Sequence, residues 1–258
     1  MKAMIFAAGL GTRLKPLTDT MPKALVRVCG KPLLYHVMHR LVSAGFDEIV
    51  INVHHFADMI EEYLASEAIP GVKVSISDER DMLRETGGGI RHARKFLDGD
   101  FLVHNVDIIS DLDIGWFLSQ CRPGAMATLL VSARKTSRYL LFDDSMRLVG
   151  WTNTVTGEVR SPYPGLEVDA CRKLAFSGIH YISDSIFDVM DRYDRNAIAS
   201  GGSPFGDRFP IMDFYLKTAA EYPVYGVEAE DLHLVDVGKL QSLDEAERLC
   251  ASLLKQDL

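Results

Sequence analysis

Strand-like and helix-like patterns alternate along the first part of the chain, and this alternation constrains the fold more than any other feature. Four short runs rich in apolar residues have the length of buried strands: 2–7, 48–53, 72–76 and 101–104. Between them lie segments with apolar residues at three- and four-residue steps, as in helices: 32–44, 56–64 and 88–96. Strand–helix–strand units of this kind predict a parallel sheet with right-handed crossovers. We therefore expect an α/β fold with three layers, Rossmann-like, around a mostly parallel sheet.

The second half of the chain continues this order less regularly. The region 140–177 has short apolar pieces between polar turns, which predicts antiparallel strands or a lid. The other expected elements are a helix over 114–120, strands over 125–132 and 174–182, a helix over 211–220, strands over 224–227 and 232–237, and a closing helix over 240–254. No repeat or linker interrupts them, so we expect one domain over 1–258, with 199–204 as a mobile loop.

The overall charge and the cysteines argue against several classes of protein. The 258 residues carry a formal net charge of −8, whereas broad nucleic-acid binding needs a basic stripe. The four cysteines are scattered without a C-x-x-C pair, which favours reduced cytosolic thiols over a zinc site or a disulfide framework. No apolar run approaches the length of a membrane span, about 18 residues. We expect a cytoplasmic protein that binds neither nucleic acid nor membranes.

The first expected strand runs into a loop that suits a phosphate group. Small residues and glycines let the backbone approach a ligand and let successive N–H groups surround an anion. The loop begins with Ala7, Ala8, Gly9, Leu10, Gly11 and Thr12. Arg13 adds a planar guanidinium suited to two phosphate oxygens, and Lys23 adds a compact cation. The glycines alone fit a purely structural turn equally well, but together with the two cations they indicate phosphate binding.

Two other glycine motifs do not fit this chain. A dinucleotide fingerprint, G-x-G-x-x-G, needs a third glycine where this chain has Leu14. A P-loop needs Gly-Lys followed by Ser or Thr, whereas Gly30-Lys31 is followed by Pro32. The loop therefore indicates phosphate binding of another kind.

A second glycine-rich segment lies where a loop enters a helix. It contains Glu85, Thr86, Gly87 and Gly88. Unpaired N–H groups at a helix start, together with glycines, suit the approach of a flat base; a flexible helix start is the alternative. Asn52 ends the second strand, where it suits a base, a ribose or simply a turn.

Polar residues also follow later strands. Asn105 and Asp107 follow the fourth strand, at the carboxyl edge where open α/β sheets bind ligands. Asp236 stands after another apolar run, in Val-Asp-Val-Gly. An aspartate alone at such a position could merely cap a helix.

These motifs resemble the signature of sugar-phosphate nucleotidyltransferases. The family pattern A-A-G-x-G-[ST]-R-x-x-P-L-T, followed by P-K-P-L, matches residues 7–18 and Pro22-Lys23, with Ala24 in place of the second proline. The family's N-G-D, F-x-G-I and W-x-D-V-G-T motifs are similar to residues 105–107, 176–179 and 234–239. Val106 and Lys239 depart from the glycine and threonine of these motifs, but neither departure removes a carboxylate.

The resemblance implies a fold of the nucleotide-diphospho-sugar transferase type. Residues 1–132 would form the nucleotide-binding half, and 133–258 the sugar-binding half, with a small antiparallel portion and the closing helix. The resemblance further implies a nucleobase contact at 85–88, sugar contacts at Asn105 and Gly178, and Mg²⁺ on Asp107 and Asp236. Arg13, Lys23 and Asp107 would be the catalytic residues.

The resemblance also implies the substrates. The chain is most similar to compact uridylyltransferases that act on N-acetylmuramic acid 1-phosphate, which would make UTP and that sugar phosphate its partners. Mannose 1-phosphate guanylyltransferases, which use GTP, are the alternative, although the E-K-P element they often carry is absent from 150–154. A non-catalytic nucleotide-sugar-binding regulator is an alternative of another class. The protein is expected to be a monomer or a homodimer.

Overall fold

A computed structural model describes residues 1–256, and its contacts divide the chain into two compact units. Unit one consists of residues 1–83, 103–115 and the chain from 231 onward. Unit two consists of residues 84–102 and 116–230. Each unit is therefore assembled from segments far apart in the sequence. None of the helices within residues 1–256 has the length and hydropathy needed to cross a membrane.

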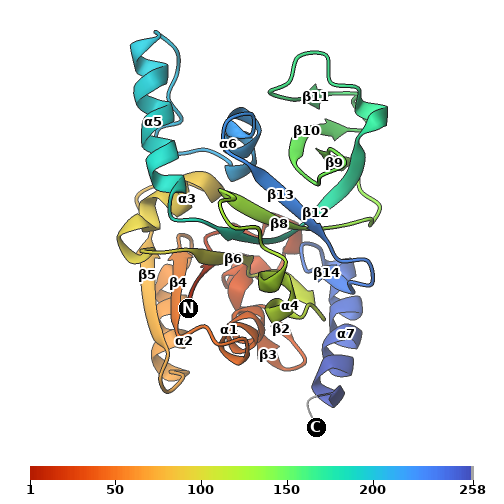
Figure 1. The fold of residues 1–258 in the computed structure, drawn as a ribbon. Coiled ribbons are helices and arrows are strands. Elements are labelled where there is room, and N and C mark those ends of the chain that lie inside the picture. The colour runs from red at the N-terminus through yellow and green to blue at the C-terminus, as the bar shows by residue number, and fades with distance from the viewer. Residues whose placement is uncertain (257–258) are drawn as a thin grey trace. The chain divides into compact units, whose positions relative to one another are not determined.

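Unit one contains the parallel strands that the first part of the sequence predicts (Figure 1). The strands β1 (Lys2–Phe6), β4 (Glu48–Val53) and β5 (Lys73–Asp78) pair in parallel. Strand β6 (Phe101–Asn105) spans a boundary between the units, and its residues 103–105 belong to unit one. The order is β6-β1-β4-β5. The middle of β1 is completely buried, as expected for a strand covered on both faces. The helices of this unit are α1 (Leu33–Ser43), α2 (Ala57–Ser66) and α7 (Leu243–Gln256).

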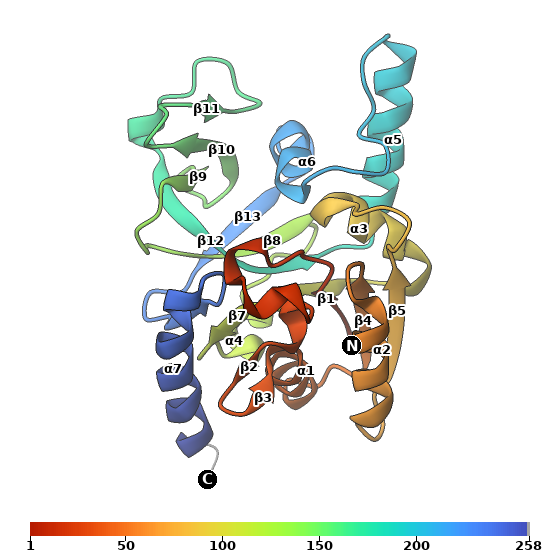
Figure 2. The ribbon, with the colours of Figure 1, turned by 180° about the vertical axis from the view of Figure 1, so that it is seen from behind.

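Short irregular elements follow the strands of unit one. Figure 2 shows the chain between β1 and α1, in red, as a winding segment with short helical turns at Thr12–Leu14, Leu17–Asp19 and Lys23–Leu25. It ends in the small hairpin of β2 (Arg27–Val28) and β3 (Lys31–Pro32). A second small ladder pairs β7 (Ile108–Ser110) with β14 (Leu234–Asp236), and a further turn at Leu240–Ser242 precedes α7.

Unit two is built mainly from antiparallel strands. Its strands are β8 (Ala127–Ser132), β9 (Arg138–Phe142), β10 (Leu148–Asn153), β11 (Val159–Arg160), β12 (Arg172–Ile182) and β13 (Val224–Glu228). Strands β11, β10, β9 and β12 pair antiparallel in that order, β12 also pairs antiparallel with β8, and β13 adds to β8 in parallel. Its helices are α3 (Glu85–His92), α5 (Ile186–Ala199) and α6 (Ile211–Thr218), with short turns at Ala93–Phe96 and Val168–Ala170. Helix α4 (Ile114–Ser119) spans a boundary between the units.

The observed elements confirm the expected mixed α/β fold with a mostly parallel central sheet. The region 140–177 contains antiparallel strands rather than a lid alone. Two expectations were incomplete. Helix α3 begins three residues before the expected 88, and α5 was not predicted, because its buried residues all lie in its first turns. The division into halves at residue 132 stays a prediction.

Candidate active site

The loop after β1 is fixed at its start by a buried side chain. The Oδ1 atom of Asn52 accepts hydrogen bonds from the backbone N–H of Ala7 at 2.8 Å and of Ala8 at 3.4 Å. Asn52 is 3% exposed, at the end of β4 beside β1. The structure therefore gives it the role of holding the loop, and a direct contact with base or ribose stays a prediction.

A second contact closes the loop further along. The Thr18 hydroxyl donates to the Gly11 carbonyl at 2.8 Å. Gly11 has a φ of 62°, in the left-handed region, and a Cβ there would lie 2.8 Å from Thr18 Cγ2 and 3.1 Å from Lys23 Cβ. A glycine is thus required at position 11. At Gly9, by contrast, a Cβ would meet nothing within 4 Å.

Lys23 and Asp107 form an ion pair inside unit one, through Nζ and Oδ2. Lys23 begins a short helical turn that Pro22 introduces, and the two side chains are only 10% and 18% exposed. The Asp107 carbonyl accepts a hydrogen bond from the Val237 N–H at 2.8 Å. Asp236, the residue before Val237, stands opposite Ile108 in the β14–β7 ladder. Two segments distant in sequence thus bring both aspartates to neighbouring positions.

Arg13 lies at the same place. A Cβ built on Gly238 would be 2.7 Å from Asp236 Oδ1 and 2.9 Å from an Arg13 guanidinium nitrogen. The Asp236 carboxylate and the Arg13 guanidinium therefore approach the same point beside the Gly238 backbone. A side chain at position 238 would occupy that point. Unit one gathers two cations and two carboxylates from three segments: Arg13 and Lys23 from the chain after β1, Asp107 from the turn between β6 and β7, and Asp236 from β14.

Unit two holds the second glycine-rich segment, at the start of α3. The N–H groups of Gly87 and Gly88 donate to the Phe209 carbonyl at 2.8 and 3.2 Å. A Cβ on Gly87 would lie 2.3 Å from the Phe209 ring, and one on Gly88 would lie 2.2 Å from the Asp207 carbonyl oxygen. The glycines here are required by packing within the chain. The expected nucleobase contact stays a prediction. It is restricted to the face of this segment that does not pack against residues 207–209.

The two side chains before these glycines are also engaged within unit two. The Thr86 hydroxyl accepts from the Ile211 N–H at 2.8 Å, and Glu85 accepts from Arg208 Nε at 3.3 Å. Glu85 has a φ of 60°, which is unusual for a residue with a side chain. The segment 207–211 therefore supports the start of α3.

Comparison with known proteins identifies the family. Residues 2–139 match the sequence profile of a protein family that is described as Nucleotidyl transferase. The N-acetylmuramate alpha-1-phosphate uridylyltransferase of Caulobacter vibrioides is 34% identical over 241 residues, which span 89% of each chain. This chain belongs to the nucleotidyl transferase family. The match confirms the resemblance seen in the sequence motifs.

Two further proteins are similar to this nucleotidyl transferase, one in sequence over part of the chain and one in structure over nearly the whole chain. The mannose-1-phosphate guanylyltransferase catalytic subunit beta of Danio rerio is 42% identical over 115 residues, but this covers 43% of our chain and 32% of that protein. A solved structure of a putative glucose-1-phosphate thymidylyltransferase from Bacillus anthracis superposes with a TM-score of 0.77, covering 96% of our chain and 94% of that one. At 19% identity the second likeness shows the fold alone.

The aspartate pair of this nucleotidyl transferase fits a magnesium ion. Among residues 1–256, no cluster of three or more His, Cys, Asp or Glu side chains is arranged for a metal. Mg²⁺ does not need such a cluster, because it keeps several waters and is held by one or two carboxylates plus substrate phosphates. Asp107 and Asp236 provide two hard oxygen donors at neighbouring positions, so the residues present suit this ion.

The sugar contacts expected in this nucleotidyl transferase lie in different units. Asn105 ends β6 in unit one, and its carbonyl bonds to Nδ1 of the buried His104 at 2.8 Å. Burial lowers the pKa of His104 to about 4, so that ring is neutral near pH 7. Gly178, in unit two, has a φ of 76° and lies where the β12–β8 register shifts. Their roles as sugar contacts stay predictions.

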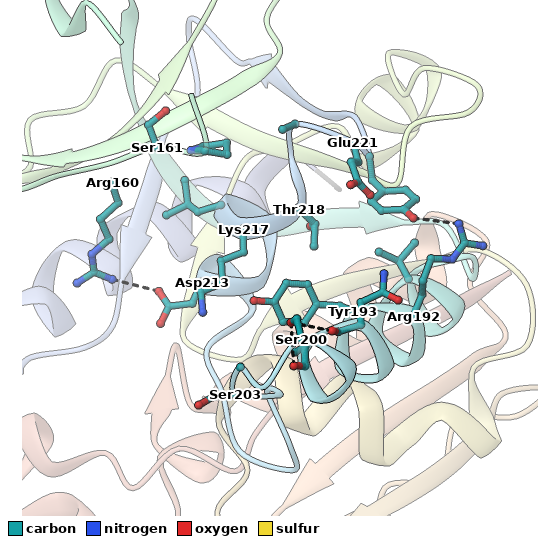
Figure 3. A pocket seen from close by; sticks show the side chains of 18 residues that line it. Arg160, Ser161, Arg192, Tyr193, Ser200, Ser203, Asp213, Lys217, Thr218 and Glu221 are labelled. Atoms are coloured by element: carbon teal, nitrogen blue, oxygen red, sulfur yellow. Dashed lines mark hydrogen bonds and ion pairs between the residues drawn. The ribbon is translucent and has the colours of Figure 1, made fainter. Parts of the chain in front are cut away.

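Unit two also contains a cavity that the sequence did not indicate (Figure 3). It has a volume of about 890 Å³ and lies between α5, α6 and the chain at 160–162. Arg160 and Asp213 form an ion pair on one wall at 3.2 Å, and Arg192 donates to the Tyr222 hydroxyl on another at 3.2 Å. None of the site residues expected from the sequence lines this cavity.

Proposed function

We propose that this protein joins a sugar 1-phosphate to a nucleoside triphosphate, with Mg²⁺, and releases pyrophosphate. The observation that carries the proposal is the cluster in unit one, where the Lys23–Asp107 pair adjoins the point shared by Arg13 and Asp236. Two cations and two carboxylates at the end of a glycine loop suit the handling of several phosphates. The 34% identity to a uridylyltransferase over most of both chains supports the same reaction class.

The proposed reaction is an in-line displacement at phosphorus. An oxygen of the sugar 1-phosphate forms a bond to the α-phosphorus of the triphosphate. The bond from that phosphorus to the oxygen that links it to the β-phosphorus breaks, and this oxygen leaves as part of pyrophosphate. The attacking phosphate is already anionic near neutral pH, so no general base is required. The protein must hold two anions together and stabilise the charge on the departing pyrophosphate.

The residues of unit one divide this work. Arg13 presents a planar guanidinium, which suits two oxygens of the β- and γ-phosphates. Lys23 carries its ammonium on a side chain that is 10% exposed, where a point charge acts strongly on an α-phosphate or on the sugar phosphate. Its present partner, Asp107, keeps that ammonium in place. Asp107 and Asp236 would hold Mg²⁺, which when bound neutralises phosphate charge and orients both substrates.

We propose UTP and N-acetylmuramic acid 1-phosphate as the substrates. The relative from Caulobacter vibrioides that supports this choice matches the chain over nearly its whole length. GTP and mannose 1-phosphate are the second candidates, because the Danio rerio relative has a higher sequence identity to this chain, although over a shorter part of it. We also infer a cytoplasmic location, which the free thiols of all four cysteines support.

Pyrophosphate release tests the proposal directly. The protein is incubated with Mg²⁺, each of four nucleoside triphosphates, and a panel of sugar 1-phosphates that includes N-acetylmuramic acid and mannose. The fastest release is expected with UTP and N-acetylmuramic acid 1-phosphate, and chelation of Mg²⁺ by EDTA should abolish it. Preference for GTP and mannose 1-phosphate would select the second candidate. Binding without turnover on every pair would show a non-catalytic regulator.

A further inference from the structure

A buried amide and a buried carboxylate meet beneath the loop that follows β1. Asn52 Nδ2 donates to Glu79 Oε1 at 2.8 Å, and both residues belong to unit one. Asn52 is 3% exposed and Glu79 is fully buried. The sequence analysis did not single out Glu79. A fully buried carboxylate is costly unless it is paired and hydrogen-bonded, so its place in the fold calls for a specific use.

The backbone of Glu79 is fixed to the end of β4. Its N–H donates to the Val53 carbonyl at 2.8 Å, and its own carbonyl bonds to His54 Nδ1 at 2.6 Å. Glu79 also follows directly after β5, which is paired along its whole length with β4. The carboxylate is therefore presented from a rigid sheet edge, and it sets the direction in which the Asn52 amide points.

That direction decides what the loop can do. With Nδ2 engaged by Glu79, Oδ1 of Asn52 faces the N–H groups of Ala7 and Ala8 and accepts both. If the amide turned over, its NH₂ group would face these two donors, and buried N–H groups would lose their acceptor. The amides of Ala7 and Ala8 are thus engaged within the protein. Donors for a phosphate must come from residues further along the loop, toward Arg13.

We infer that Glu79 and Asn52 are positioning residues for nucleoside triphosphate binding. Glu79 orients Asn52, Asn52 anchors the start of the loop, and the anchored loop holds Gly9 to Arg13 against the phosphates. This role deepens the proposed function of the same site and rests on it. Neither side chain needs to touch the substrate.

A charge-exchange pair of variants tests the inference. Asn52→Asp replaces the amide donor with a carboxylate, so that two acceptors face each other at positions 52 and 79. In the double variant Asn52→Asp with Glu79→Gln, the new amide at position 79 can donate to the new carboxylate at position 52. The single variant should raise the KM for the triphosphate about tenfold to hundredfold, as expected when a reacting group is displaced by about 1 Å. The KM for the sugar phosphate should change much less, and the double variant should recover most of the loss.

Ser77→Ala is the matched control. Ser77 lies on β5 directly opposite Asn52, is 1% exposed, and has a buried hydroxyl without a hydrogen-bond partner within the described residues. It should keep wild-type kinetics. If Asn52→Asp does not fold, Asn52→Ser, which is too short for both contacts, replaces it.

Amide hydrogen exchange over residues 2–14 gives a readout that does not depend on turnover. Exchange at the start of the loop should speed up in Asn52→Asp and return toward the wild-type rate in the double variant. Faster exchange in a protein that turns over no substrate pair would support the anchoring while refuting the proposed function. Unchanged exchange and unchanged KM in Asn52→Asp, or no recovery in the double variant, would overturn the inference.

Discussion

The chain has two glycine-rich segments, one in each unit, and they differ in what lies against their glycines. In unit one, a Cβ on Gly9 would meet nothing within 4 Å. In unit two, a Cβ on Gly88 would lie 2.2 Å from a backbone carbonyl oxygen. The first segment leaves one face open at Gly9, although its Gly11 packs against Thr18 and Lys23, whereas Gly87 and Gly88 of the second segment both let two parts of the chain pack closely. Glycines in similar sequence patterns can therefore be present for different physical reasons.

The comparison predicts that the largest losses of activity come from unit one. Lys23→Ala removes the ammonium beside Asp107 and should lower kcat by about 10²–10³, the usual cost of losing one group that stabilises transition-state charge. Affinity for the triphosphate should fall less, because Arg13 remains. Steady-state kinetics with saturating triphosphate measures both effects.

Lys15→Ala is the control for that variant. Lys15 is on the same loop, is 60% exposed, and pairs with the exposed Asp19 at 2.9 Å. It should retain nearly full activity. If Lys23→Ala is as active as Lys15→Ala, the chemistry does not depend on the unit-one cluster.

In unit two the comparison predicts a loss of stability instead. Gly88→Ala forces a methyl group against the Asp207 carbonyl, which cannot rotate away as a side chain could. Overpacking of this kind costs about 1–3 kcal/mol of unfolding free energy. Urea unfolding followed by circular dichroism measures it. A variant as stable as the wild type would show that the segment 207–211 is loosely packed on α3.

An effect on stability of similar size should come from acid, and it acts in both units. Burial lowers the pKa of His104 in unit one from 6.5 to about 4 and that of His180 in unit two to about 3. Between these values and 6.5 the unfolded chain binds protons that the folded protein does not. The stabilisation is thus complete above pH 6.5 and is lost as pH falls, by about 2 kcal/mol at pH 5 for His104.

Urea unfolding at pH 7 and pH 5 checks the direction in which the unfolding free energy changes with pH. His104→Gln and His180→Gln should each flatten part of the pH dependence, and if the units unfold separately, each variant should flatten only its own transition. A stability that does not change between these two pH values would contradict the burial of both rings.

The sequence predicted which charged side chains lie near one another in unit one better than it predicted what surrounds them. Arg13 and Lys23 stand in one short motif, so local spacing was enough to select them. Pairing Asp107 with Asp236 needed the family resemblance, since the ladder that joins them connects distant segments. Glu79 gave no signal, because an acid among the charged residues after a strand is normally solvent-exposed. The packing of Gly88 also escaped prediction, because its partner, Asp207, is remote in sequence.

The smallest predicted effect is the sharpest test of the comparison. Gly9→Ala adds one methyl group at a point that, apart from Gly9 and its two chain neighbours, has no atom of residues 1–256 within 4 Å, and Gly9 has no positive φ that a side chain would strain. Its unfolding free energy should stay within about 0.5 kcal/mol of the wild type. If the open face receives phosphates, the same methyl should raise the KM for the triphosphate by about tenfold or less. Calorimetric titration with a triphosphate separates binding from turnover. A stable variant with unchanged affinity would mean that this face is open but unused, and that the phosphates are held by side chains alone.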